Sequence, residues 1–203
     1  MTGPAAGPTK IAVVGAGSVG ATLAYACLIR GVARTIALYD VDAAKTRAET
    51  LDLNHGLQFV PMATVIGSDD IEVCRGADLV VVTAGAKQKP GQTRLELAAA
   101  DIVRRVVGAA EEVIRGKGAT NYAVGLAATQ IIEAVLRDQR QVLPVSSLLE
   151  DHRGISDVCL SVPSVVDRDG VETVLPVRLS EEEAEGLRRS ADTVRGVIGA
   201  LGL

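Results

Sequence analysis

The sequence predicts an α/β protein in which a short parallel sheet is followed by an antiparallel meander. A β-branched run over residues 10–14 ends in a glycine-rich turn, and three more short apolar runs follow at 35–39, 63–66 and 77–83. Connections between these runs are long enough for crossovers, as parallel strands require. Residues 141–179 instead hold three apolar runs joined by short turns, which is typical of an antiparallel meander in an α+β portion.

The first run leads into a G-x-G-x-x-G pattern at Gly15, Gly17 and Gly20. In a dinucleotide-binding turn the first glycine allows the bend, the second lets a pyrophosphate approach, and the third lets helix and strand pack closely. A helix over residues 18–30 is predicted to begin inside the turn, so its N-terminus faces the phosphates. The alternative is an ordinary strand–turn–helix connection that binds no nucleotide.

The second run, Thr35–Tyr39, ends at Asp40, twenty positions after Gly20. A carboxylate there accepts hydrogen bonds from both ribose hydroxyls and repels a 2′-phosphate, which favours NAD over NADP. Asp42 is predicted to cap a helix over residues 43–57, and Lys45 lies in its first turn, close to the predicted ribose site. The alternative for Asp40 is a surface aspartate.

The run 77–83 is predicted to be a buried parallel strand because its β-branched content is continuous. Right-handed crossovers then place the four strands in the order 3-2-1-4. Gly85 and Ala86 follow at the carboxyl edge, where small residues let the backbone approach a cofactor. A plain strand-ending turn is the alternative for Gly85.

A polar loop over residues 87–94 carries Pro90-Gly91 at its tip and ends in Arg94. Such a loop beside a cofactor is predicted to act as a lid whose arginine polarises a substrate carbonyl, the alternative being a solvated connector. Two helices are predicted next, over Leu95–Arg115 and Asn121–Arg137. Residues predicted to face inward on the second are Tyr122, Leu126, Ile131, Ala134 and Val135.

The C-terminal portion is predicted to hold strands over 141–149, 157–166 and 171–179, the last two joined by the turn 167–170. Ser180 and Glu183 have the spacing of a capping box, which predicts the start of a final helix.

No strand-like run occurs between Thr83 and Gln141, so strands 5 and 6 of a full doubly wound sheet are missing. The fold class is therefore a truncated Rossmann-type parallel sheet with a C-terminal α+β portion. Leu79–Val82 would then form an exposed apolar edge, which invites pairing or aggregation. The two histidines, His55 at a helix end and His152 in a loop, are not expected to act as proton donors.

Composition excludes several function classes. A net charge of −4, with no tryptophan, three tyrosines and one phenylalanine, argues against nucleic acid as a partner. No apolar run is long enough to span a membrane, and residues 1–9 resemble a disordered tail rather than a signal peptide. Cys27, Cys74 and Cys159 are scattered inside apolar segments, which predicts reduced core cysteines, no metal site and a cytoplasmic location.

Several segments together resemble the L-lactate dehydrogenases of the lactate/malate dehydrogenase family. Besides the glycine turn and Asp40, these segments are Leu51–Gly56, Thr83–Leu95, Lys117–Ala123 and Asp157–Pro163. The resemblance implies NAD-dependent interconversion of lactate and pyruvate, and it leaves a homo-oligomer open. Residues implied to contact the cofactor are Gly15, Gly17, Ser18, Val19, Gly20, Asp40, Lys45, Gly85, Ala86 and Val124.

On the substrate side, the resemblance implies roles for Gln88, Arg94 and Thr120. Gln88 resembles the residue that separates lactate from malate dehydrogenases, because a neutral glutamine suits a methyl group and an arginine would pair with a second carboxylate. This disfavours malate dehydrogenase. Arg94 resembles the lid arginine that stabilises charge on the carbonyl oxygen, and Thr120 the threonine of the substrate pocket.

The chain departs from the family by a large internal deletion, predicted near Ala100–Asp101. Residues 1–9 are then a tail, 10–100 a partial NAD-binding domain and 101–203 a remnant of the substrate domain. The lost stretch would hold the catalytic histidine, its aspartate and the arginine that binds the substrate carboxylate. The sequence therefore predicts a crippled or inactive L-lactate dehydrogenase, with a non-catalytic NAD-binding module or a structural remnant as alternatives.

Overall fold

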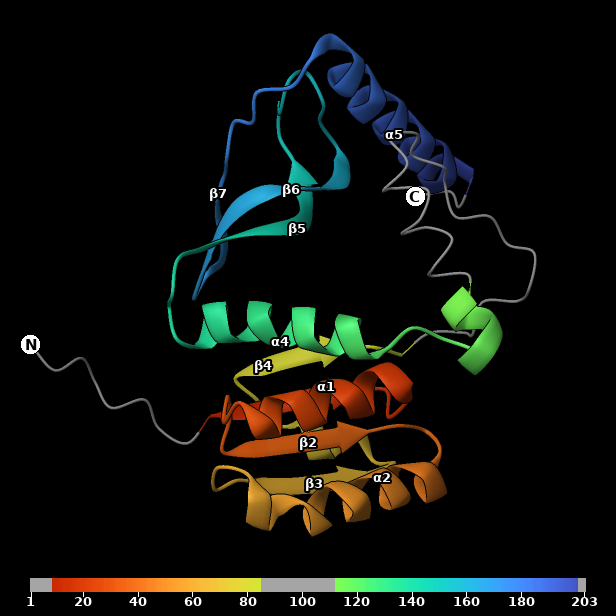
Figure 1. Ribbon diagram of the computed structural model, residues 1–203, viewed down its shortest axis with the longest axis vertical. Helices are drawn as coiled ribbons and strands as arrows, with labels where there is room; N and C mark the ends of the chain where they lie inside the picture. The colour runs from red at the N-terminus through yellow and green to blue at the C-terminus, as the bar shows by residue number, and fades with distance from the viewer. Residues whose placement is uncertain (1–8, 85–111, 201–203) are drawn as a thin grey trace, which may run out of the picture. The chain divides into compact units, whose positions relative to one another are not determined.

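The computed structural model describes residues 9–84 and 112–200 (Figure 1). The chain falls into two compact units that divide between Gln130 and Ile131. The domain boundary predicted between residues 100 and 101 lies outside the described residues and stays a prediction, as does the predicted tail over residues 1–9.

The first unit contains a four-stranded parallel sheet with the predicted strand order, β3-β2-β1-β4. The central pair is in register from Lys10 opposite Thr35 to Val14 opposite Tyr39. Because all four strands are parallel, their carboxyl ends meet at one edge of the sheet. The strands are β1 (Lys10–Val14), β2 (Thr35–Tyr39), β3 (Thr64–Ser68) and β4 (Leu79–Val82).

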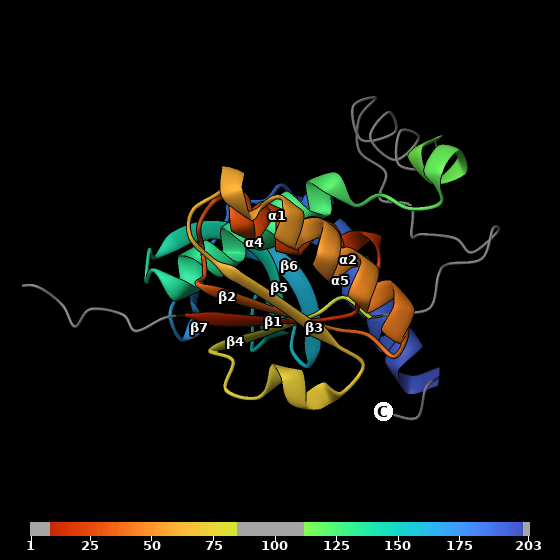
Figure 2. The ribbon, with the colours of Figure 1, turned by 90° about the horizontal axis from the view of Figure 1, so that it is seen from below.

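Helices α1 (Ser18–Ile29) and α2 (Ala43–His55) cover one face of this sheet, and the short helix η2 (Ile71–Cys74) lies on the opposite face (Figure 2). Another short helix, η1 (Leu57–Phe59), follows α2. The predicted cap of α2 is confirmed, since the Asp42 carboxylate accepts the Lys45 backbone N–H at 3.0 Å. The centres of β1 and β2 form the core, where Ile11, Ala12, Val13, Ile36, Ala37 and Leu38 have no exposed surface.

The prediction that residues 77–83 form a buried strand is wrong, because Leu79 and Val81 are only half-buried and Val80 and Val82 are exposed. Val80 is 54% exposed and Val82 is 68% exposed. The reason is position, because among the described residues β4 pairs with β1 on one side and with no strand on the other. The exposed apolar edge predicted for Leu79–Val82 is therefore confirmed.

Helix α4 (Tyr122–Leu136) matches the predicted helix to within a residue at each end. Ala134 is buried as predicted, but the buried face of the first half of the helix differs from the prediction. Tyr122, Leu126 and Ile131, predicted to face inward, are 69%, 54% and 37% exposed. The first half of α4 instead buries Gly125 and Thr129, as well as Asn121 just before the helix. Of the preceding predicted helix, Leu95–Arg115, only residues 112–115 are described; they are helical, and the helix continues to residue 117, two residues beyond its predicted end.

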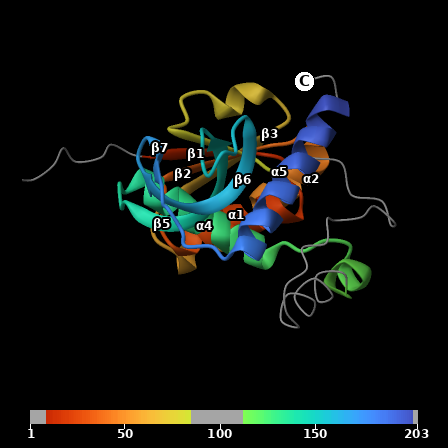
Figure 3. The same cartoon turned by 90° about the horizontal axis from the view of Figure 1, so that it is seen from above.

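The second unit is a three-stranded antiparallel sheet, β5 (Gln141–Leu149), β6 (Val158–Asp167) and β7 (Gly170–Val174), with helix α5 (Glu181–Ala200) running obliquely beside it (Figure 3). Ala191 of α5 packs in one apolar cluster with Leu149, Val158 and Val162 of the sheet. The predicted capping box is confirmed, because Ser180 N–H donates to the Glu183 carboxylate at 2.8 Å and Glu183 N–H donates to the Ser180 hydroxyl at 3.2 Å.

None of the three cysteines forms a disulfide. Cys27 is buried as predicted, but Cys159 is exposed because it falls on the outward-facing side of β6, where alternate residues point away from α5. In the described parts of the chain, no helix is both long and apolar enough to cross a membrane.

Candidate functional site: the glycine turn at the carboxyl edge

The turn between β1 and α1 is held tightly by neighbouring backbone. Gly15 has a φ of +108°, which strongly favours glycine, and its N–H donates to the Tyr39 carbonyl at 2.7 Å. A Cβ on Gly20 would collide with the Gly15 carbonyl oxygen and lie 2.8 Å from Thr83 Oγ1. The turn and the carboxyl ends of β2 and β4 are thus fixed together.

Gly17 is the open glycine of the turn. It occupies the N-cap position of α1, and no side chain caps this helix. Among the described residues, a Cβ there would meet a single atom within 4 Å, Lys45 Nζ at 3.8 Å. The uncapped backbone N–H groups of the first turn, the positive end of the helix dipole and a nearby ammonium group together suit a phosphate.

Asp40 lies beside this turn at the end of β2. Its Oδ2 accepts the Ala16 backbone N–H at 2.8 Å, and its Oδ1 accepts the Asp42 N–H at 3.2 Å. Lys45 Nζ lies 3.6 Å from Asp40 Oδ2. The Asp42 N–H, followed by the Ala16 N–H and the Lys45 charge, lowers the pKa of the Asp40 carboxyl against an opposing desolvation effect. Asp40 is therefore ionised at neutral pH.

The Asp40 carboxylate has acceptor capacity beyond these bonds, because an ionised carboxylate offers about four lone-pair sites. Its side chain is 18% exposed, so these sites are reachable from solvent. A partly exposed carboxylate next to an open phosphate cradle fits the adenosine ribose and pyrophosphate of NAD, and its charge disfavours a 2′-phosphate.

The structure brings together some predicted site residues and leaves others undescribed. Gly15, Gly17, Gly20, Asp40 and Lys45 gather at the turn. Ser18 is exposed and Val19 half-buried in the first turn of α1. Thr120 and Val124 flank the start of α4, with Val124 44% exposed. Gly85, Ala86, Gln88 and Arg94 lie outside the described residues, as does the predicted deletion point.

Neither histidine belongs to the elements that form the glycine turn. His55 is the last residue of α2, and His152 forms an isolated bridge with Ile155 in the second unit. Because α2 begins just after β2, at the carboxyl edge of the sheet, His55 lies at the end of that helix farther from this edge. The described residues also contain no cluster of histidine, cysteine or carboxylate side chains that could hold a metal ion.

Sequence reasoning missed Thr83 as a part of the turn. Its hydroxyl donates to the Gly15 carbonyl at 2.9 Å and lies close to both Gly15 and Gly20. Strand register could have indicated Thr83. Because Val82 pairs with Val14, the residues that follow them, Thr83 and Gly15, must meet at the carboxyl edge of the sheet.

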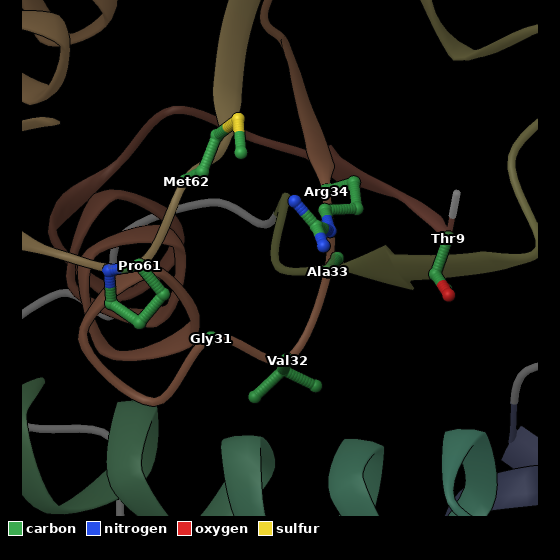
Figure 4. Close-up of a pocket in the computed structure, with 7 residues that line it drawn as sticks. All are labelled: Thr9, Gly31, Val32, Ala33, Arg34, Pro61 and Met62. Carbon is green, nitrogen blue, oxygen red and sulfur yellow. The ribbon is translucent and has the colours of Figure 1, made fainter. Parts of the chain in front are cut away.

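One hollow in the described part of the chain lies away from the glycine turn. A cavity of about 420 Å³ is lined by Thr9, Gly31, Val32, Ala33, Arg34, Pro61 and Met62 (Figure 4). These residues precede β1, β2 and β3, so the cavity lies at the amino edge of the sheet. Ligands of open α/β sheets bind at the carboxyl edge, so this cavity is not the nucleotide site.

Comparison with known proteins supports the interpretation of the glycine turn as part of an NAD binding domain. Residues 9–124 match the family model of the lactate/malate dehydrogenase NAD binding domain. An L-lactate dehydrogenase of Bifidobacterium animalis subsp. lactis is 34% identical over 312 residues, covering 96% of this chain and 98% of that protein. An L-lactate dehydrogenase of Synechococcus sp. is 30% identical, covering 95% and 99%.

Solved structures show the same fold. A minor L-lactate dehydrogenase from Enterococcus mundtii superimposes with a TM-score of 0.85 at 23% identity, covering 95% of this chain and 98% of that one. A lactate dehydrogenase from a deep-sea metagenome library gives 0.83 at 22% identity, covering 97% and 99%. The Bifidobacterium alignment runs over 312 residues, 109 more than the 203 of this chain, and reaches nearly both ends of each protein. The shortfall is therefore internal, as predicted.

Proposed function

Because the chain belongs to the lactate/malate dehydrogenase family, whose NAD binding domain it carries, we propose that it binds NAD(H) at the glycine turn and has lost most of the family's hydride transfer. The observation that carries this proposal is the open Gly17: within the described ranges, a Cβ built there would meet only Lys45 Nζ, at 3.8 Å, while Gly15 and Gly20 are closely packed. Space is left at the one glycine where a pyrophosphate would approach the backbone.

Each residue of the turn has a physical task in this proposal. The N–H groups of Ser18 and Val19 at the start of α1, together with the Lys45 ammonium, bind the phosphates. Asp40 accepts the ribose hydroxyls while its bond from Ala16 holds the turn in shape at 2.8 Å. Gly85 and Ala86 let backbone approach the cofactor, and Val124 packs against the nicotinamide ring. NAD(H) supplies the hydride chemistry when bound.

The substrate side is proposed from the family resemblance. Arg94 would polarise the carbonyl of pyruvate, Thr120 would line the pocket, and Gln88 would accept the methyl group rather than a second carboxylate. This assignment favours lactate and pyruvate over malate and oxaloacetate as the substrate class. A cytoplasmic location and a homo-oligomeric state belong to the same proposal.

Loss of activity follows from the missing proton donor. His55 ends α2 and His152 lies in the second unit, and neither matches the family's catalytic histidine. Losing a general acid costs roughly 10²–10⁴ in rate. The chain would retain cofactor binding, so we favour a non-catalytic NAD-binding module. The competing hypothesis is a structural remnant that binds no cofactor.

A Gly17→Ala variant tests where the cofactor binds. The new methyl group has room in the structure, so the melting temperature should stay unchanged, while the methyl occupies the approach of the pyrophosphate. We expect NADH affinity to fall at least tenfold, measured by the nicotinamide's own fluorescence in a chain that has no tryptophan.

Gly196→Ala on α5 is the matched control, because a Cβ there meets nothing within 4 Å. It should bind NADH like the wild type. Equal NADH affinity in Gly17→Ala and wild type would place the nucleotide elsewhere, and no binding by folded wild-type protein would favour the remnant.

A further inference from the structure

Three polar groups link the first turn of α1 to the start of α4. The Thr22 hydroxyl donates to the Ser18 carbonyl at 2.7 Å, one turn back along α1. The same oxygen accepts the side-chain N–H of Asn121, also at 2.7 Å. A hydroxyl has a single hydrogen to donate, so Thr22 Oγ1 commits that hydrogen to Ser18 and a lone pair to Asn121.

The two helices meet closely at this point, which keeps the link short. A Cβ on Gly125 would lie 2.9 Å from Thr22 Cγ2 and 3.2 Å from the Leu23 nitrogen. One turn further, Thr129 Oγ1 lies 3.7 Å from Cys27 Sγ, and Thr129 has no exposed surface. The face of α4 that meets α1 is thus small and polar, while Tyr122 and Leu126 point to solvent.

Asn121 lowers the stability of the folded chain at this position. It is 7% exposed, and its Oδ1 is buried without a hydrogen-bond partner. A buried acceptor without a partner destabilises the folded state, so an apolar residue would serve the packing of these helices better. The hydrogen bond from the Asn121 side chain to Thr22 therefore explains this residue better than a contribution to the stability of the fold does.

We propose that Asn121 is a positioning residue that couples cofactor binding at the glycine turn to the order of residues 120–126 at the start of α4. The link begins at Ser18, the first residue of α1, and ends beside Thr120 and Val124. Immobilising the first turn of α1 restrains Thr22 and, through it, the start of α4. This inference rests on the proposed function, because it needs NAD(H) to bind at the turn.

Thr22→Val breaks the link with little change in shape, because valine keeps both branches at Cβ and lacks the hydroxyl. Hydrogen exchange of the backbone over residues 120–126 is measured by mass spectrometry with and without saturating NADH. In the wild type we expect NADH to slow exchange there at least tenfold. In Thr22→Val, with NADH bound, the slowing should fall below threefold.

Two matched variants separate positioning from general stability. Thr22→Ser retains the hydroxyl and should keep the tenfold slowing. Thr193→Val removes the same kind of bond on α5, where the Thr193 hydroxyl donates to the Arg189 carbonyl at 2.8 Å, and should leave the slowing intact.

The outcomes distinguish this inference from the proposed function. If the wild type binds NADH and residues 120–126 show no slowing, or if Thr22→Val keeps the full slowing, this inference is wrong and the proposed function stands. If titration shows that the wild type binds no NADH, both are wrong.

Discussion

Strands β1 and β4 are neighbours of similar composition in one sheet, yet they differ sharply in burial. Ile11, Ala12 and Val13 of β1 have no exposed surface, whereas Val80 and Val82 of β4 are more than half exposed. The difference lies in their neighbours, since β1 pairs on both sides and β4 pairs with β1 alone among the described residues. Apolar content predicts a strand, and the presence of a second neighbour decides whether the strand is buried.

The same comparison shows what the deletion leaves in place. Everything that shapes the glycine turn comes from β1, β2, β4 and the first two helices, which all lie in the part that the chain retains. The part that relatives have in addition would follow β4 in a doubly wound sheet and would give it a second neighbour. One truncation thus leaves the glycine turn in place and removes the second neighbour of β4.

The largest expected effect comes from truncating one buried side chain in β1 and one solvated side chain in β4. Ile11→Ala in β1 should lower the free energy of unfolding by about 2–5 kcal/mol, as for buried large-to-small changes. Val80→Ala in β4 should lower it by less than about 1 kcal/mol because that side chain is already solvated. Urea denaturation followed by circular dichroism measures both, and equal losses would contradict the burial difference.

A charge on the exposed edge sharpens the comparison further. Edge strands with bare apolar faces pair with other chains, and lysine blocks such pairing. Val82→Lys should therefore reduce concentration-dependent association in sedimentation velocity while changing stability by under about 0.5 kcal/mol. Val197→Lys, at another exposed valine on α5, is the control. If both lysines reduce association equally, β4 is not the contact surface.

The smallest effect concerns pH at the carboxyl end of β2. The pKa of Asp40 is lowered in the folded chain, chiefly by the Asp42 N–H, so ionised Asp40 favours folding. This contribution is complete above the ordinary pKa of 3.8 and is lost as pH falls through the lowered value. Asp40→Asn should flatten the stability curve in that acid range, measured by urea denaturation at successive pH values. An unchanged curve would mean that the Asp40 bonds do not stabilise the turn.

Much of the fold could be predicted because its signals are local. The cap at Asp42, the box at Ser180 and Glu183, and the strand order all follow from short patterns and the handedness of crossovers. The buried face of α4 could not, because apolar periodicity favours Leu126 while close approach to α1 selects Gly125 and Thr129.

Some residues of the candidate site could likewise be predicted from local sequence patterns, and others could not. Gly15, Gly17 and Gly20 with Asp40 form a motif of known spacing, so the sequence alone points to them. Thr83 and Asn121 act through partners 68 and 99 positions away, and no local pattern reveals such contacts. Which side of a strand or helix meets a distant segment depends on packing of the whole unit.

The most direct test of the account is NADH titration of purified wild-type chain, followed by addition of pyruvate to the same sample. We expect nicotinamide fluorescence to show saturable binding, and pyruvate to leave the NADH unoxidised. Turnover within tenfold of an intact L-lactate dehydrogenase would contradict the proposed loss of hydride transfer. Failure of the folded chain to bind NADH would contradict the assignment of the glycine turn itself.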